Sequence, residues 1–168
     1  ELVTRQSLGS FGLFNSFNSI SGTVGKFSYY TYLNYKKGDG FRPNSEFEST
    51  NYFGSFGYEF SERTSATFEF TSLNYLAQQP GGLTDFWFRS DSAYSVSNRS
   101  RNWFEVNWKL YALKLEHKLT ERTDLSVSLF GLDAERNAVG FRGNPRDANS
   151  NPITQNDELN PDGSYFFS

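Results

Sequence analysis

Apolar and polar residues alternate in several stretches of the chain, most clearly in residues 27–36 of "TVGKFSYYTYLNYKKGDGF". Because successive side chains of a strand point to opposite faces, this period of two predicts a β-strand with two unlike faces. One face would carry Phe27, Tyr29, Leu33 and Tyr35, and the other Ser28, Asn34 and Lys36. The same pattern predicts further strands at about residues 11–18, 52–60, 66–70, 103–119 and 125–129.

The strand predicted at 103–119 changes the parity of its apolar positions. Phe104, Val106, Trp108 and Leu110 share one parity, whereas Leu113, Leu115 and Leu119 share the other. An extra residue in a strand shifts all later side chains to the opposite face, so the pattern predicts a β-bulge near Tyr111–Ala112. A turn at that point is the second interpretation.

Short turns and long loops follow one another in strict alternation. Short turns are predicted at 23–26, 61–64 and 120–123, and long loops at 37–50, 76–100 and 135–168. The pairs "FSERTSATFEF" and "LTERTDLSVSLF" indicate one hairpin turn used twice. Outer-membrane barrels segregate their connections in this way, with short periplasmic turns and long extracellular loops.

The pattern therefore favours an all-β, antiparallel transmembrane barrel over a soluble all-β sheet protein, which stays the alternative. Phe27, Tyr29, Leu33 and Tyr35 are expected to face lipid, and Ser28, Asn34 and Lys36 the lumen. Because Glu59, Glu69 and Glu105 alternate with apolar residues, they are expected to face the lumen as well.

Composition supports this interpretation. Only 36% of the 168 residues are hydrophobic, and aromatic residues supply 18%, so few aliphatic side chains remain for a sealed core. No apolar run reaches the ~18 residues of a spanning helix. The net charge of -3 argues against a nucleic-acid partner, which a basic protein would suit better. With no cysteine and only His117, neither a metal site nor a nucleophile–base pair is expected, so we expect no enzyme and no cofactor.

Several segments go beyond periodicity. The stretches "GTVGKFSYYTYLNYKKGDGFR", "QQPGGLTD", "RNWFEVNWKL" and "LFGLDAERNAVGFR" resemble the barrel of TonB-dependent outer-membrane receptors, in particular the ferric-citrate receptor-like branch. The resemblance runs over nearly the whole chain.

The resemblance implies that residues 1–168 are part of such a barrel and supply about six strands of a barrel with 22. A plug domain would lie upstream of Glu1 and further strands downstream. The implied function is uptake of a ferric chelate across the outer membrane of a Gram-negative bacterium. The implied partners are the chelate, outer-membrane lipid and lipopolysaccharide, and the inner-membrane TonB complex, reached through the plug.

Arginines gather in the segments expected to lie outside the cell. Seven of the ten fall there or at the edges, namely Arg42, Arg89, Arg99, Arg101, Arg136, Arg142 and Arg146, but only two of six lysines do. The guanidinium group binds carboxylates bidentately, so the set favours an anionic chelate. The candidate ligand residues are Arg99, Arg101, Arg136 and Arg142, with Trp87 as an aromatic contact.

Other functions remain open at this stage. The same family includes receptors for glycans and other nutrients, and a small autonomous barrel acting as an adhesin or structural protein is a different class. A barrel hydrolase would need a Ser–His pair, for which His117 stands at the wrong end of its strand. External arginines also have ordinary roles, since they pair with lipopolysaccharide phosphates or with loop carboxylates.

Overall fold

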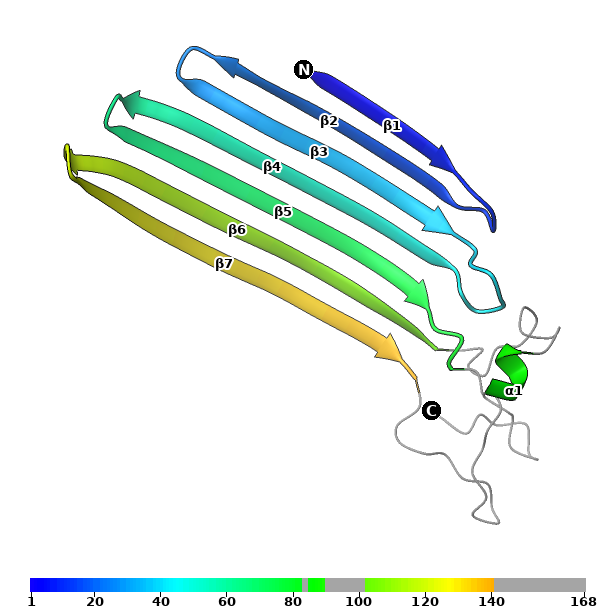
Figure 1. Ribbon diagram of the computed structural model, residues 1–168. Helices are drawn as coiled ribbons and strands as arrows, with labels where there is room; N and C mark the ends of the chain where they lie inside the picture. The colour runs from blue at the N-terminus through cyan, green and yellow to red at the C-terminus, as the bar shows by residue number, and fades with distance from the viewer. Residues whose placement is uncertain (83–84, 90–101, 141–168) are drawn as a thin grey trace.

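The computed structural model describes residues 1–82, 85–89 and 102–140, which form one antiparallel sheet (Figure 1). Its elements are β1 (Leu2–Leu8), β2 (Phe14–Val24), β3 (Phe27–Gly38), β4 (Phe47–Ser61), β5 (Thr64–Gln78), α1 (Asp85–Phe88), β6 (Trp103–Thr120) and β7 (Thr123–Val139). Each strand pairs only with its neighbours in sequence, in the order β1-β2-β3-β4-β5-β6-β7. The all-β antiparallel prediction is confirmed, and β1 and β7 are the two edges of the described sheet.

The described sheet has seven strands rather than about six. The extra strand, β1, has the sequence LVTRQSL, in which polar residues occupy both parities, so alternation does not reveal it. The strand predicted from residue 11 begins only at Phe14, because Phe11 (φ 58) and Gly12 (φ 67) form the turn after β1. The long loops are also shorter than predicted, since β3 extends to Gly38, β4 begins at Phe47 and β7 extends to Val139.

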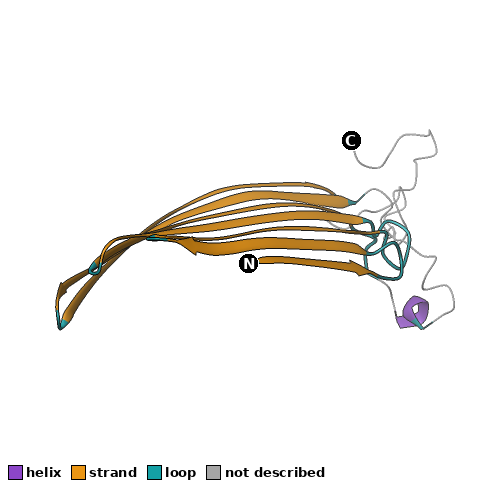
Figure 2. Cartoon of the chain, turned by 90° about the horizontal axis from the view of Figure 1, so that it is seen from above, coloured by secondary structure: helices purple, strands orange, loops and turns teal. Residues whose placement is uncertain are grey.

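The sheet is a single layer without a core of its own (Figure 2). Among the described residues, Ala77 is the only buried apolar residue, and large side chains such as Phe130 stay 83% exposed. The short turns lie at one end of the strands and the longer connections at the other. In the parts of the chain that the structure describes, no helix has both the length and the apolar character needed to cross a membrane.

The two hairpins with the sequence Glu-Arg at their turns are built alike, as the repeated sequence predicts. Ser61 pairs with Thr64 and Thr120 with Thr123, and in each case the preceding strand carries one extra residue. The hydroxyl groups of Ser61 and Thr120 each accept a hydrogen bond from the backbone N–H two residues on, at 3.2 Å. These local bonds hold the turns, and the extra residue supplies the twist that the flanking strands need.

The β2–β3 turn connects its two strands tightly by means of a glycine instead of a hydroxyl contact and an extra residue. Val24 pairs with Phe27, so only Gly25 and Lys26 connect the strands. Gly25 has φ +59, whereas Lys26 is not among the residues with positive φ. A positive φ at the first central residue alone is the requirement of a type II′ turn, which glycine meets without strain.

The β-bulge predicted near Tyr111–Ala112 does not exist. Pairing runs without interruption from Trp103 to His117 against β5, and the register shift of β6 lies between Lys118 and Thr120. The change in apolar parity therefore has another cause, which is that the sheet exchanges its apolar and polar faces partway along the strands.

We call the two sides of the sheet the Phe27 face and the Tyr30 face, each comprising the named residue and all residues on the same side by register. We call residues 20–31, 54–70 and 111–131 the turn half, and residues 3–8, 14–19, 32–38, 47–53, 71–78, 103–110 and 132–139 the loop half. In the turn half the Phe27 face is apolar, with Val24, Phe27, Tyr29, Phe56, Tyr58, Phe68, Leu113, Leu115, Val127 and Leu129. The Tyr30 face there carries Thr23, Ser28, Ser55, Ser65, Thr67, Glu69, Lys114, Glu116, Ser126 and Ser128.

From β5 to β7 the loop half reverses this arrangement, whereas on β3 the Phe27 face keeps Leu33 and Tyr35. The Phe27 face of the loop half also carries Lys37, Glu48, Glu105, Asn107, Lys109, Asp133, Glu135 and Asn137. Its Tyr30 face carries Phe17, Tyr32, Phe47, Phe53, Leu73, Tyr75, Phe104, Val106, Trp108, Leu110 and Leu132. The register confirms that Phe27 and Tyr35 lie opposite to Ser28 and Lys36. It also shows that one expectation was wrong, because Glu105 lies on the other face from Glu59 and Glu69.

Candidate functional site

Charge is divided unevenly between the two faces of the loop half. Every carboxylate on its described strands, namely Glu48, Glu105, Asp133 and Glu135, lies on the Phe27 face, where Lys37 and Lys109 are the cations. The Tyr30 face of the same strands carries no carboxylate and has cations only. This face therefore attracts anions, whereas the opposite face is mixed in sign.

Three cations make up this charge, and we call them the cationic belt: Arg5 on β1, Lys36 on β3 and Arg136 on β7. Lys36 and Arg136 lie at one level, because the register carries Lys36 through β4 and β5 to Val106, which pairs with Arg136. Arg5 pairs with Phe17 two residues nearer the turn half. All three side chains are exposed, and within the described residues none of them forms an ion pair.

Aromatic side chains orient the belt at β7. The guanidinium carbon of Arg136 lies 5.8 Å from the centre of the Phe104 ring, within the range of a cation–π contact. The Phe104 ring in turn meets the Tyr75 ring edge-on, with 5.3 Å between centroids. A guanidinium held over a ring keeps its N–H groups at the margin of the ring, where they can bind a carboxylate in bidentate fashion.

The structure places only part of the predicted ligand set. Arg136 lies in the belt, on the face opposite to Phe27, whereas Arg99, Arg101 and Arg142 lie outside the described residues. Trp87 belongs to α1, and the structure does not describe its side chain.

Sequence reasoning did not select Arg5 and Lys36 as ligand residues. Arg5 lies on β1, the strand that alternation did not predict. Lys36 was expected to face the lumen, but only the register across β3–β7 shows that it shares a level with Arg136.

Arg42 serves the loops themselves. Its Nη2 donates a hydrogen bond to the carbonyl oxygen of Gly81, and its guanidinium carbon lies 5.7 Å from the centre of the Phe41 ring. Burial lowers the pKa of the Arg42 guanidinium below its usual value. Nearby, Asn44 Nδ2 donates to the carbonyl of Asn102 at 3.1 Å. The β3–β4 loop is thereby tied to both ends of the β5–β6 connection, and the contact of Arg42 is the ordinary role expected of a loop arginine.

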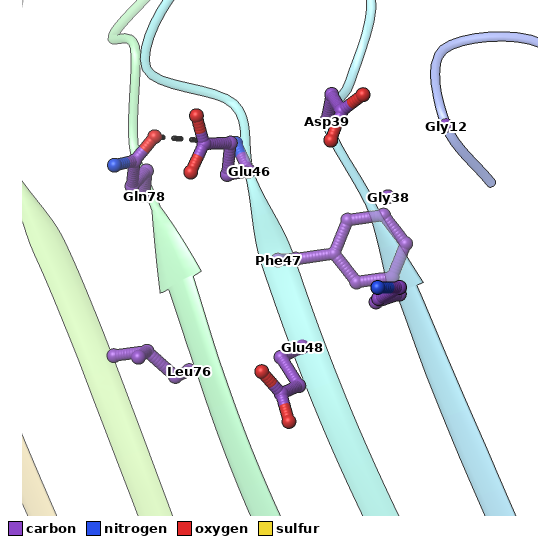
Figure 3. A pocket seen from close by; sticks show the side chains of 9 residues that line it. Gly12, Gly38, Asp39, Glu46, Phe47, Glu48, Leu76 and Gln78 are labelled. Carbon is purple, nitrogen blue, oxygen red and sulfur yellow. Dashed lines mark hydrogen bonds between the residues drawn. The ribbon is translucent and has the colours of Figure 1, made fainter. Parts of the chain in front are cut away.

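A pocket at the loop end of β3–β5 has the opposite charge to the belt (Figure 3). Its charged lining consists of Asp39, Glu46, Glu48 and Lys37, and the Glu46 N–H donates to Gln78 Oε1 at 3.3 Å across its rim. Three carboxylates against one ammonium group would repel an anionic chelate, so the belt is the better candidate site.

His117 lies on β6 close to the short turn, where its Nδ1 is 2.9 Å from the Thr64 hydroxyl. Over the described part of the chain, no group of three or more His, Cys, Asp or Glu side chains is arranged to hold a metal ion. The functional candidates are thus the belt and the aromatic rings beside it.

Comparison with models of known protein families and with curated proteins gave no match for this chain.

Proposed function

We propose that the sheet is part of the wall of a TonB-dependent outer-membrane receptor that takes up a ferric chelate of the ferric-citrate type. The observation that carries the proposal is the shape of the apolar band on the Phe27 face. The band covers residues 27–35 on β3 and 111–119 on β6, which is nine residues on each strand. A tilted membrane-spanning strand needs about 9–11 residues.

The turn-side edge of this band steps along the sheet. Phe27, beside the first short turn, pairs with Tyr58, but β4 continues for three more residues to Ser61. Thr64, beside the second turn, pairs with His117, and β6 likewise continues for three residues to Thr120. Each short turn thus lies farther along the strands than the turn before it, as the staggered turns of Figure 1 show.

The loop-side edge steps in the same direction. The first charged residues of the Phe27 face are Lys37 and Glu48 on β3 and β4, but Lys109 and Asp133 on β6 and β7. Lys109 pairs with Ser72, which pairs with Tyr52, so Lys109 lies level with Tyr52. Tyr52 is four residues from Glu48, so the edge of the charged region shifts by four residues from the β3–β4 pair to the β6–β7 pair. Four residues over three strand spacings correspond to an angle of roughly 40° between the band and the rows of the sheet.

A step of this size is the stagger of a closed barrel, whose strands tilt by about 35–45°. At that tilt, nine residues rise by roughly 20 Å, close to the about 25 Å apolar height of outer-membrane barrels. In this arrangement the apolar band of the Phe27 face contacts lipid, and the strand residues on the loop side of the band project beyond the membrane with the Tyr30 face turned inward.

The charge of the inward-turned Tyr30 face supports an anionic ligand. The cationic belt would then face the interior, with Lys36 at the loop-side edge of the apolar band and Arg136 beyond it, and the absence of carboxylates on this face of the loop half, over the described strands, favours an anionic chelate. Energy from the TonB complex, reached through a plug domain, and contact with lipopolysaccharide belong to the proposal through the family resemblance of the sequence.

Uptake of iron-55 citrate by cells that carry the full-length protein, in a strain without other citrate receptors, tests this function. Lys36 and Lys37 give a matched pair, because they are adjacent in sequence and lie on opposite faces. Neutralising Lys36 (Lys36→Gln) should weaken binding of ferric citrate about three- to tenfold, because an ion pair at short range in water contributes on the order of 1 kcal/mol. Lys37→Gln should leave binding unchanged. Failure of the unaltered protein to bind or import any ferric chelate would refute the proposal.

A second candidate, uptake of a neutral glycan, is favoured by one cluster. The Tyr32 ring stacks on Phe53 and lies tilted against Phe17, with 5.6 and 5.4 Å between ring centroids, and its hydroxyl donates to Asn51 Oδ1 at 3.2 Å. Aromatic faces beside amide groups suit sugars as well as they suit packing. Glycan binding that is independent of both salt and Lys36 would support this candidate over an anionic chelate.

A further inference from the structure

The contact between Phe104 and Arg136 has a consequence for ligand selection. Arg136 stands on β7 opposite Val106, and the Phe104 ring comes from the neighbouring β6, two residues nearer the loops. The guanidinium therefore leans along the sheet over the ring, 5.8 Å from its centre. Tyr75, on β5, supports the far side of that ring through its edge-on contact at 5.3 Å.

The geometry points to Phe104 as a positioning residue for Arg136, so that the row Tyr75–Phe104–Arg136 forms a subsite for a planar carboxylate. This inference rests on the proposed function. An arginine side chain has several rotatable bonds, and binding that immobilises it loses rotamer entropy. A guanidinium already held over a ring loses less, and its N–H groups stay directed along the plane in which a carboxylate binds.

The surroundings of Arg136 support a ligand-directed role over a purely structural one. Its neighbours on the Tyr30 face are Val106 and Ala134, and the nearest carboxylate on β7, Glu135, lies on the opposite face. Arg136 forms no ion pair within the described residues, so its charge is available to a ligand rather than used within the sheet.

The test is equilibrium binding of ferric citrate to the full-length receptor, with a neutral ferric trihydroxamate as a second probe. Phe104→Leu removes the ring and should weaken ferric citrate binding about two- to fivefold, in line with a solvent-exposed cation–π contact. Phe104→Tyr keeps the ring and should restore binding. Phe130→Leu is the matched control, since Phe130 lies on the same face, on the strand of Arg136, and is 83% exposed.

A double-mutant cycle separates positioning from general packing. In an Arg136→Gln background, Phe104→Leu should produce no further loss, because the group that it positions is already gone. Arg136→Lys should fail to restore binding, since an ammonium group lacks the bidentate geometry. Unchanged ferric citrate binding in Phe104→Leu, or an additive loss in the double variant, would overturn the inference while leaving the proposed function standing. If the unaltered protein does not bind ferric citrate, both this inference and the proposed function are refuted.

Discussion

An arginine placed in the middle of the apolar band tests the membrane assignment directly. Leu115 lies on the Phe27 face, midway along β6 between Lys109 and Glu121 in the turn, and its side chain is 42% exposed in the isolated sheet. At about 3.3 Å per residue and roughly 40° of tilt, Leu115 lies some 10 Å from the nearer edge of the band. That depth is close to the bilayer midplane of the proposed arrangement.

Leu115→Arg should therefore lower the free energy of unfolding by about 2–4 kcal/mol, the penalty of arginine at the midplane of a barrel. This corresponds to a roughly 30- to 900-fold smaller folding equilibrium constant. The measurement is reversible guanidinium unfolding of the full-length protein in lipid vesicles. Asn107→Arg is the control outside the apolar band, because Asn107 occupies the same strand and face but lies on the loop side of Lys109. There the penalty should fall to about 0–1 kcal/mol.

A third variant compares the effect of an arginine on the two faces of β6 at similar depth. Ala112 lies on the Tyr30 face, so Ala112→Arg should be tolerated better than Leu115→Arg. Equal losses for Leu115→Arg and Asn107→Arg, or a greater loss for Ala112→Arg, would show that the Phe27 face of the turn half does not contact lipid. Cooperative folding of all variants in buffer without lipid or detergent would favour the soluble sheet instead.

Three further predictions concern the turns and the edges. Gly25→Ala should destabilise the protein by about 1–2 kcal/mol, because φ +59 strains any side chain, whereas Gly131→Ala, with open space around it, should not. Thr120→Val should reduce stability by about 0.5–1 kcal/mol through loss of the hydrogen bond to the Arg122 N–H, with no change in expression. Residues 1–168 alone should fail to form a heat-resistant, membrane-inserted species on gels, because unpaired strand edges are not tolerated in lipid.

Each of these outcomes has a defined contradiction. Equal melting temperatures for Gly25→Ala and the parent protein would contradict the assignment of a type II′ turn with positive φ at Gly25. A Thr123→Val variant as unstable as Thr120→Val would show that the hydroxyl acceptor is not the cause. A protease-protected, inserted product from residues 1–168 alone would show that the described edges can be closed without further strands.

The sequence predicted the class and most strands of the fold because alternation is strong wherever one face is apolar and the other polar. It failed on β1, whose polar residues occupy both parities. The parity change on β6 was detected correctly but explained wrongly, since a bulge and an exchange of faces produce the same pattern in one strand. Only the neighbouring strands distinguish the two explanations, because the exchange also appears on β5 and β7 at the same level.

The candidate site was less accessible to sequence reasoning. Clustering of arginines led to Arg136, but the cationic belt is defined by the register across seven strands, from Arg5 on β1 to Arg136 on β7. Residues a hundred positions apart, such as Lys36 and Arg136, cannot be placed at one level from periodicity alone. The same holds for Glu105, whose parity within β6 said nothing of the face on which it lies.

The two Glu-Arg hairpins have a consequence for how such a wall could grow in evolution. Each hairpin adds two strands and the same three-residue step, held by the same hydroxyl contact and the same extra residue. In a closed barrel the tilt depends on the ratio of stagger to strand number, so duplicating one such unit raises both together. If the sheet belongs to such a barrel, as proposed, a gene that gained or lost a hairpin of this type would change the barrel's diameter, but the strand tilt and the fit to the bilayer thickness would be inherited unchanged.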